Sequence, residues 1–252
     1  SPNTSSSRST ISLPVVKDAS ESNCRVRPFE NVTISGNIAT GNGARGGGIM
    51  IKTTSQDGRI DSDNIFNNLS LNGNESDYGG GIYISSNSMN TVNNVVLSDN
   101  TAYEDGGGIF TESGSASLII NSTIVDNNTF GDGPGLYIED DLNGPVIVNS
   151  IIWGNMQAGE TGVEQLSFDI DSDIHMYIAH SNIEGAYNTQ SGQWFTLEEG
   201  FEPDQINYLE DSFSYTNLDI DPLFNADYSL SQNSPCINTG ANQLDFSNNE
   251  IE

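Results

Sequence analysis

Short apolar runs recur along the chain, and polar residues follow each run in the same order. In five segments an isoleucine or leucine stands three positions before an asparagine; these are residues 34–37, 71–74, 97–100, 124–127 and 152–155. Successive asparagines of this series are 37, 26, 27 and 28 residues apart. A nearly fixed period of this size is typical of proteins built by stacking one structural repeat.

Each repeat contains short apolar runs separated by glycine, asparagine, aspartate and serine. Glycine clusters that lead into an apolar triplet follow the first four asparagines, at residues 46–51, 79–84, 106–111 and 133–138. Runs this short, rich in valine, isoleucine and tyrosine, predict β-strands, and no window has a helical period. One repeat therefore predicts one coil of three strands. Stacked coils pair each strand in parallel with its copies, at a rise of about 4.8 Å per coil.

The repeated residues have assigned places in such a stack. The apolar residues of the series form an interior column of Ile34, Leu71, Leu97, Ile124 and Ile152. The asparagines form a ladder at a corner, which comprises Asn37, Asn74, Asn100, Asn127 and Asn155. Asparagine tolerates the left-handed backbone that a sharp corner needs, and its amide bonds to the same amide one coil away. The glycine clusters let the next corner form without a Cβ clash.

The repeats resemble those of secreted bacterial right-handed parallel β-helix proteins. The segments NSTIVDN at 121–127 and GGGIY at 79–83 carry this resemblance. Further segments make the C-terminal third similar to the choice-of-anchor and polymorphic outer-membrane-like repeat group, namely residues 149–155, 181–185, 219–224, 227–230 and 234–240. The resemblance covers residues 31–240 and implies a fold and an extracytoplasmic location. It implies no reaction, because the group shares no catalytic motif.

We therefore expect an all-β chain, a single-stranded right-handed parallel β-helix of about seven or eight coils. Residues 1–28 are expected to be a polar leader and an N-terminal cap over the open end of the helix. The helix is expected over residues 29–240, with a long external insertion at about 190–216. Residues 241–252 are expected to be a C-terminal tail, truncated relative to the family. In the sixth repeat Ala186 replaces the ladder asparagine, so the corner is expected to change there.

Charge is distributed unevenly along the sequence. All seven lysines and arginines lie in the first 59 residues, and the formal net charge is −28. The other residues carry 31 of the 35 acidic side chains. Such a surface repels nucleic acid and anionic lipid and attracts divalent cations. No apolar run in the sequence is long enough to span a membrane.

Three carboxylates at alternate positions, Asp169, Asp171 and Asp173, form the candidate metal site. In an extended segment they project to one side, which suits oxygen ligation of calcium, the one cofactor that the sequence indicates. The alternative is a solvated acidic turn, because the segment lacks the glycine and distal glutamate of a helix–loop–helix calcium site. Residues 139–141 are a weaker version of the same pattern.

A second candidate site is a column of side chains in the strand after each glycine cluster. Tyr83, Phe110 and Tyr137 share one phase with Met50, whereas the aliphatic residue before each of them points the other way. If the aliphatic residues face the core, the aromatic stripe lies outside, where it would stack on sugar rings or on a partner. The alternative is a self-stabilising ladder of stacked side chains.

Catalysis has weaker support in the sequence. A polysaccharide lyase needs a basic residue, and the repeats after Arg59 contain no lysine or arginine. A glycosidase needs only two carboxylates about 5–10 Å apart, and no pair stands out by motif. His175 and His180 are five residues apart, so on a strand they lie on opposite faces and form no metal pair.

The two cysteines, Cys24 and Cys236, lie near opposite ends of the repeat array. Six or more coils place them about 30 Å or more apart, so no disulfide is expected between them. Cys236 is expected to pack as a small apolar residue in a closing coil.

These features together lead us to expect a secreted or cell-surface structural or adhesive protein. Its expected partners are other copies of itself, joined end to end or laterally into filaments, or a glycan or cell surface. The alternative is a polysaccharide-active enzyme on the same fold, with a glycosidase favoured over a lyase. The expected location is extracellular in both cases.

Overall fold

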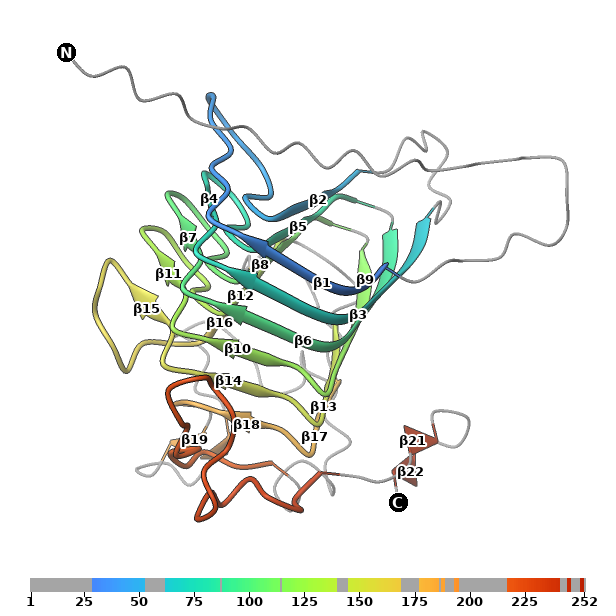
Figure 1. The fold of residues 1–252 in the computed structure, drawn as a ribbon, viewed down its shortest axis with the longest axis vertical. Coiled ribbons are helices and arrows are strands. Elements are labelled where there is room, and N and C mark those ends of the chain that lie inside the picture. Colours follow the sequence, from blue (N-terminus) through green and yellow to red (C-terminus); the bar gives the residue numbers. More distant parts are fainter. Residues whose placement is uncertain are drawn as a thin grey trace, which may run out of the picture.

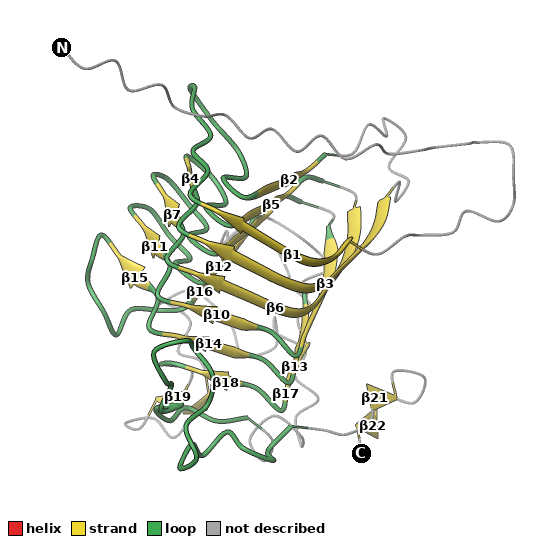
Figure 2. Cartoon of the chain, viewed as in Figure 1, coloured by secondary structure: helices red, strands yellow, loops and turns green. Residues whose placement is uncertain are grey.

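The computed structural model describes residues 29–52, 62–86, 88–113, 115–139, 145–168, 177–185, 187–188, 193–194, 217–240, 244–245 and 250–251. Every regular element in these segments is a β-strand, and most of the strands wind around one axis as a parallel β-helix (Figure 1 and Figure 2). No helix in these segments could cross a membrane. The expected leader and cap at 1–28 lies outside the described residues, as does most of the expected insertion at 190–216.

Three parallel sheets form the walls of the β-helix. The first wall contains nine strands: β1 (Phe29–Ser35), β3 (Ser62–Asn72), β6 (Ser88–Ser98), β9 (Ala116–Ile120), β10 (Thr123–Val125), β13 (Val146–Val148), β14 (Ile151–Trp153), β17 (Tyr177–Ala179) and β18 (Asn182–Ile183). The second wall contains four: β4 (Glu75–Ser76), β7 (Thr101–Ala102), β11 (Asn128–Thr129) and β15 (Met156–Gln157). The third wall contains five: β2 (Ile49–Ile51), β5 (Ile82–Ile84), β8 (Ile109–Thr111), β12 (Leu136–Ile138) and β16 (Leu166–Phe168). Two antiparallel pairs complete the set: β19 (Tyr187–Asn188) with β20 (Gln193–Trp194), and β21 (Leu244–Asp245) with β22 (Glu250–Ile251).

The β-helix has fewer coils than the sequence predicted. Four coils contribute a strand to each of the three walls, against the seven or eight expected. The predicted number was wrong because the motifs around Asn182 and Leu218 look like further repeats. Within the described residues they extend only the first wall, Asn182 through the pairing of β18 with β14 and Leu218 through a single parallel bridge to Asn182. Among the described residues, β15 and β16 are the last strands of the second and third walls.

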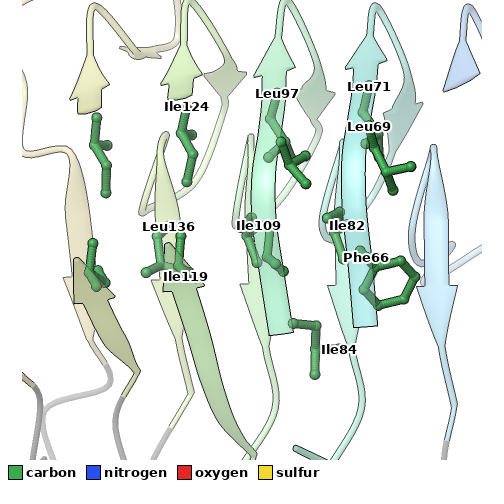
Figure 3. Close-up of a cluster of buried hydrophobic side chains, with 14 of the residues drawn as sticks. Phe66, Leu69, Leu71, Ile82, Ile84, Leu97, Ile109, Ile119, Ile124 and Leu136 are labelled. Atoms are coloured by element: carbon green, nitrogen blue, oxygen red, sulfur yellow. The ribbon is translucent and has the colours of Figure 1, made fainter. Parts of the chain in front are cut away.

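The predicted interior column fills the centre of the β-helix. Leu71, Leu97 and Ile124 pair in register across β3, β6 and β10, and all three are fully buried. Figure 3 shows them side by side in successive coils, with Ile82 and Ile109 of the third wall in the same cluster. Burial of one such side chain stabilises a fold by about 1.5–3 kcal/mol, so this column is a main source of stability.

The glycine clusters both turn the chain and bring neighbouring coils together. Gly79 has a φ angle of +65°, in the left-handed region that favours glycine. Gly81, two residues later, has no room for a side chain, since a Cβ there would lie 2.6 Å from the Gly108 carbonyl oxygen and 2.7 Å from Leu97 Cδ2. The cluster is therefore needed for packing as well as for the corner.

The described C-terminal segment, residues 217–240, folds back over the outside of the first wall, and we call it the strap. Leu218 forms the bridge to Asn182, whereas the Tyr228 hydroxyl lies 3.1 Å from a carboxylate oxygen of both Asp99 and Asp126. Figure 1 shows the segment in red, beside β14 and β18. The strap thus connects coils through contacts that do not follow the repeat.

Candidate functional site

The five ladder asparagines, which we call the inner ladder, lie in one column at the corner between the first and second walls. Asn100 shows the bonding pattern. Its Nδ2 donates to Asn127 Oδ1 in the next coil at 2.8 Å and to the Leu71 carbonyl oxygen in the preceding coil at 3.0 Å. Its Oδ1 accepts from the backbone nitrogen and the Nδ2 of Asn74, at 3.0 and 2.9 Å. Both donors and both lone pairs of this buried amide are therefore used.

The same bonds extend the inner ladder to its two outer members. Asn37 Nδ2 donates to Asn74 at 2.9 Å, and Asn127 Nδ2 donates to Asn155 at 2.8 Å. Beyond Asn155 the column ends at Gln165, whose Oε1 accepts from Asn155 Nδ2 at 2.7 Å and whose Nε2 donates to the Val163 carbonyl oxygen at 2.9 Å. Gln165 was missed in the sequence because it is out of phase with the repeat. Ala186, where the corner was expected to change, lies outside the described residues.

Two more polar ladders run along the first wall. In the serine ladder, the backbone nitrogens of Ser122 and Ser150 each donate to the hydroxyl of the serine one coil on, at 3.2 Å. An outer asparagine ladder lies at the bend of the wall, where every member has a positive φ angle: Asn31, Asn68, Asn94, Asn121 and Asn149. These asparagines recur with the period of the repeat, but the sequence contains so many other asparagines that the series was not recognised.

Tyr83, Phe110 and Tyr137 form a column of stacked rings on the third wall, which we call the aromatic column. Ring centroids are 5.1 and 5.0 Å apart, with interplanar angles of 9° and 22°. Tyr83 and Phe110 are buried and Tyr137 is half-buried, whereas Met50 at the N-terminal end of the column is 45 % exposed. The faces of Phe110 are both used by the neighbouring rings, so this geometry suits a ladder within the fold better than a platform for sugars.

A carboxylate and a guanidinium cover one end of the aromatic column. Arg45 lies 4.9 Å above the Tyr83 ring and pairs with Glu112 at 2.9 Å. Glu112 also accepts hydrogen bonds from the Tyr83 hydroxyl and from Ser86. Burial alone would raise the pKa of Glu112, but these hydrogen bonds and the charge of Arg45 bring it below its usual value. Every group in this cluster has a partner, which indicates a structural role.

A different aromatic pair is exposed. Tyr103 and Phe130 follow β7 and β11 on the second wall, and their rings stack at 5.9 Å with an interplanar angle of 12°. Tyr103 is 49 % exposed and Phe130 is 56 % exposed. This pair was not predicted from the sequence because only two repeats carry it, although each ring stands three residues after a ladder asparagine.

Carboxylates collect at the strap and around the exposed pair. The pKa of Asp126 is raised by burial and by the nearby charge of Asp99, against the hydrogen bond from Tyr228. Burial likewise raises the pKa of Glu184, although the Gly154 backbone N–H donates to it at 2.7 Å. Burial also raises the pKa of Asp105, near the exposed pair.

The candidate calcium ligands Asp169, Asp171 and Asp173 lie outside the described residues, as do Asp140 and Asp141. Within the described segments, no group of three or more histidine, cysteine, aspartate or glutamate side chains is arranged to hold a metal ion. The calcium hypothesis therefore stays a prediction.

Cys236 is a free, half-buried thiol in the strap. Its Sγ accepts a hydrogen bond from Asn182 Nδ2 at 3.1 Å, and burial raises the pKa of the thiol. Cys24 and His175 lie outside the described residues. His180 occupies the bend after β17 with a φ angle of 51°, next to the serine ladder.

Comparison with known proteins supports the fold. Residues 4–167, well over half of the chain, match the family model described as a right handed beta helix region. No curated protein and no solved structure matches the chain. The match and the parallel walls together show an all-β, right-handed parallel solenoid. The chain therefore belongs to the family of proteins with a right-handed β-helix region.

Proposed function

We propose that this chain is a structural and adhesive protein of the cell exterior, secreted or attached to the cell surface. It acts as a stiff scaffold that holds exposed turns at fixed spacing, for contact with other copies, a glycan or another surface. The inner ladder is the observation that supports this role, because an unbroken series of side-chain hydrogen bonds connects the coils from Asn37 to Gln165. The acidic composition suits a salty or calcium-containing medium, where ions screen the self-repulsion.

Electron microscopy of the purified chain, with calcium and with chelator, tests the structural part of this proposal. We expect filaments of uniform width, because four coils at about 4.8 Å each span only about 20 Å and one molecule is too short to form a rod by itself. Protease treatment of intact cells is expected to remove the protein. Filaments that dissolve in chelator would extend the function to calcium-dependent assembly. Flexible or irregular particles, or a protein protected inside cells, would contradict the proposal.

A hydrolase on the same fold is the second candidate, and one observation favours it. Asp99 and Asp126 direct one carboxylate oxygen each to the same hydroxyl, so they are as close as an acid–base pair requires. Against it, Tyr228 fills the space between them where a glycosidic bond would lie. Hydrolysis of a polysaccharide panel, lost in Asp126→Asn, would favour the enzyme; no hydrolysis by the native chain would remove this candidate.

A further inference from the structure

We propose that the exposed aromatic pair on the second wall is a docking face for a polypeptide segment that carries arginine or lysine. We call it the β7–β11 face; it comprises Tyr103 and Phe130 with the surrounding carboxylates of Glu75, Asp77, Glu104 and Asp132. The inference deepens the proposed adhesive role and rests on it, because it names the contact surface and the chemistry of the partner.

The fold holds the two rings in a fixed position. The Phe130 backbone nitrogen donates to the Ala102 carbonyl oxygen at 3.1 Å, so the two rings occupy equivalent places in neighbouring coils. The second wall forms one side of the molecule in Figure 1, where β4, β7, β11 and β15 follow one another along the axis. An aromatic surface that needs no reordering on binding loses little conformational entropy.

Among the described residues, only Tyr103 stacks on the Phe130 ring, and the other face of the ring has no aromatic neighbour. Ala158 takes the equivalent place in the next coil, where its backbone nitrogen donates to the Thr129 carbonyl oxygen at 2.6 Å. An alanine methyl covers far less of a ring than another aromatic side chain, in agreement with the 56 % exposure of Phe130. A planar guanidinium stacks well on such a ring face.

Carboxylates surround the pair and are held in place. The Tyr103 hydroxyl donates to Glu75 Oε2 at 2.8 Å, and Gln157 Nε2 donates to Asp132 Oδ1 at 3.1 Å. Glu104 and Asp132 are exposed and follow Tyr103 and Phe130 in the chain by one and two residues. A cation on the Phe130 ring would therefore have carboxylates within reach, the combination that binds guanidinium most strongly.

The charge of the chain favours a cationic partner over a neutral glycan. All lysines and arginines lie within the first 59 residues, so the field over the second wall is strongly negative and attracts positive segments from a distance. Arg45 is already engaged by Glu112 and Tyr83 on the third wall. A sugar, by contrast, gains nothing from this long-range field.

Binding of a fluorescent hexa-arginine peptide to the full chain tests the proposal, with hexa-citrulline as the uncharged probe. We expect saturable binding of hexa-arginine alone. Phe130→Ala is expected to weaken it about threefold or more, and the double variant with Tyr103→Ala about tenfold, in line with the strength of exposed cation–π contacts. Both side chains are exposed, so circular dichroism and the melting temperature should stay unchanged.

Two double variants, each lacking two carboxylates, distinguish binding at the β7–β11 face from general attraction of the peptide to the negative chain. Glu104→Gln with Asp132→Asn removes two charges at the face, and Asp221→Asn with Asp227→Asn removes two exposed charges from the strap. Only the first pair is expected to weaken binding strongly. Equal losses in both pairs, no binding of hexa-arginine, or aromatic-dependent binding of a neutral dextran instead would overturn the proposal. Filaments of this protein on the cell surface would still support the structural role in each of those cases.

Discussion

The inner-ladder asparagines Asn74, Asn100, Asn127 and Asn155 are as important to this molecule as its apolar residues, because their amides are fully buried and hydrogen-bonded. The amide of Asn100 makes bonds to three neighbouring coil positions and has no capacity left over. Neither aspartate nor serine offers the two side-chain donors that this site uses. The site therefore selects asparagine chemically, beyond the backbone geometry that the corner requires.

Replacement of Asn100 by leucine should lower the free energy of unfolding by about 3 kcal/mol or more, since it leaves buried donors of Asn74 without an acceptor. Urea unfolding followed by circular dichroism measures the change. The control is Asn67→Ala, which removes a half-buried side chain with weaker bonding and should cost about 1 kcal/mol or less. Similar losses in both variants would mean that the inner ladder has no special role.

The Tyr228 hydroxyl has one proton to donate, yet it lies 3.1 Å from oxygens of both Asp99 and Asp126. The raised pKa of Asp126 means that its charged form disfavours folding. The protonated form of Asp126 favours folding relative to the charged form. This favourable effect is fully present at acidic pH and is lost as pH rises through the pKa of Asp126 in the folded state. Asp126→Asn should accordingly raise the melting temperature at pH 7 and have little effect near pH 3.

The control for this pH prediction is Asp227→Asn in the same strap. Hydrogen bonds from Ser229 lower the pKa of Asp227, so its charged form favours folding and its loss should bring no gain at pH 7. A lower melting temperature for Asp126→Asn at pH 7 would show that the Asp126 charge is stabilising after all.

Among the elements, short strands gain stability only by stacking. β7 and β11 have two residues each, too few for an independent strand, and they persist because each pairs with a copy in the neighbouring coil. Removal of one interior side chain therefore weakens the packing of the coils on both sides.

Leu97→Ala should cost about 2–5 kcal/mol, because Leu97 is fully buried between Leu71 and Ile124 and the cavity has little room to collapse. Met89→Ala in the same strand is the control, since Met89 is 45 % exposed, and it should change stability by less than about 0.5 kcal/mol. Chemical denaturation of both variants measures the difference, and equal losses would argue against a tight interior column.

Features that repeat could be predicted from the sequence, and those that occur once could not. The interior column and the phase of the inner ladder recur in five segments, so chance similarity is excluded by the spacing. Gln165, the strap contacts of Tyr228 and the exposed Phe130 depend on where the folded chain brings single residues together, over separations of up to 129 residues. No local pattern carries that information, and the coil number failed for the same reason.

For the molecule as a whole, self-repulsion is the main electrostatic effect. With a formal charge of −28 and all basic residues near one end, added salt should stabilise the fold by screening. The melting temperature should therefore rise between 20 and 500 mM sodium chloride. The Debye length falls over this range from roughly 20 Å to roughly 4 Å, so most of the repulsion between exposed charges is screened at the upper end. A melting temperature that falls with salt would mean that ion pairs dominate instead.

The saturated bonding of the inner ladder also bears on how such a chain changes in length. Each coil accepts from the coil before it and donates to the coil after it, in the same way from Asn74 to Asn127. A tandem duplication of one whole repeat would consequently leave every amide with its full set of partners, while Gln165 still closes the column. A chain of this kind is therefore able to lengthen in steps of about 4.8 Å while the amides of its inner ladder stay fully bonded.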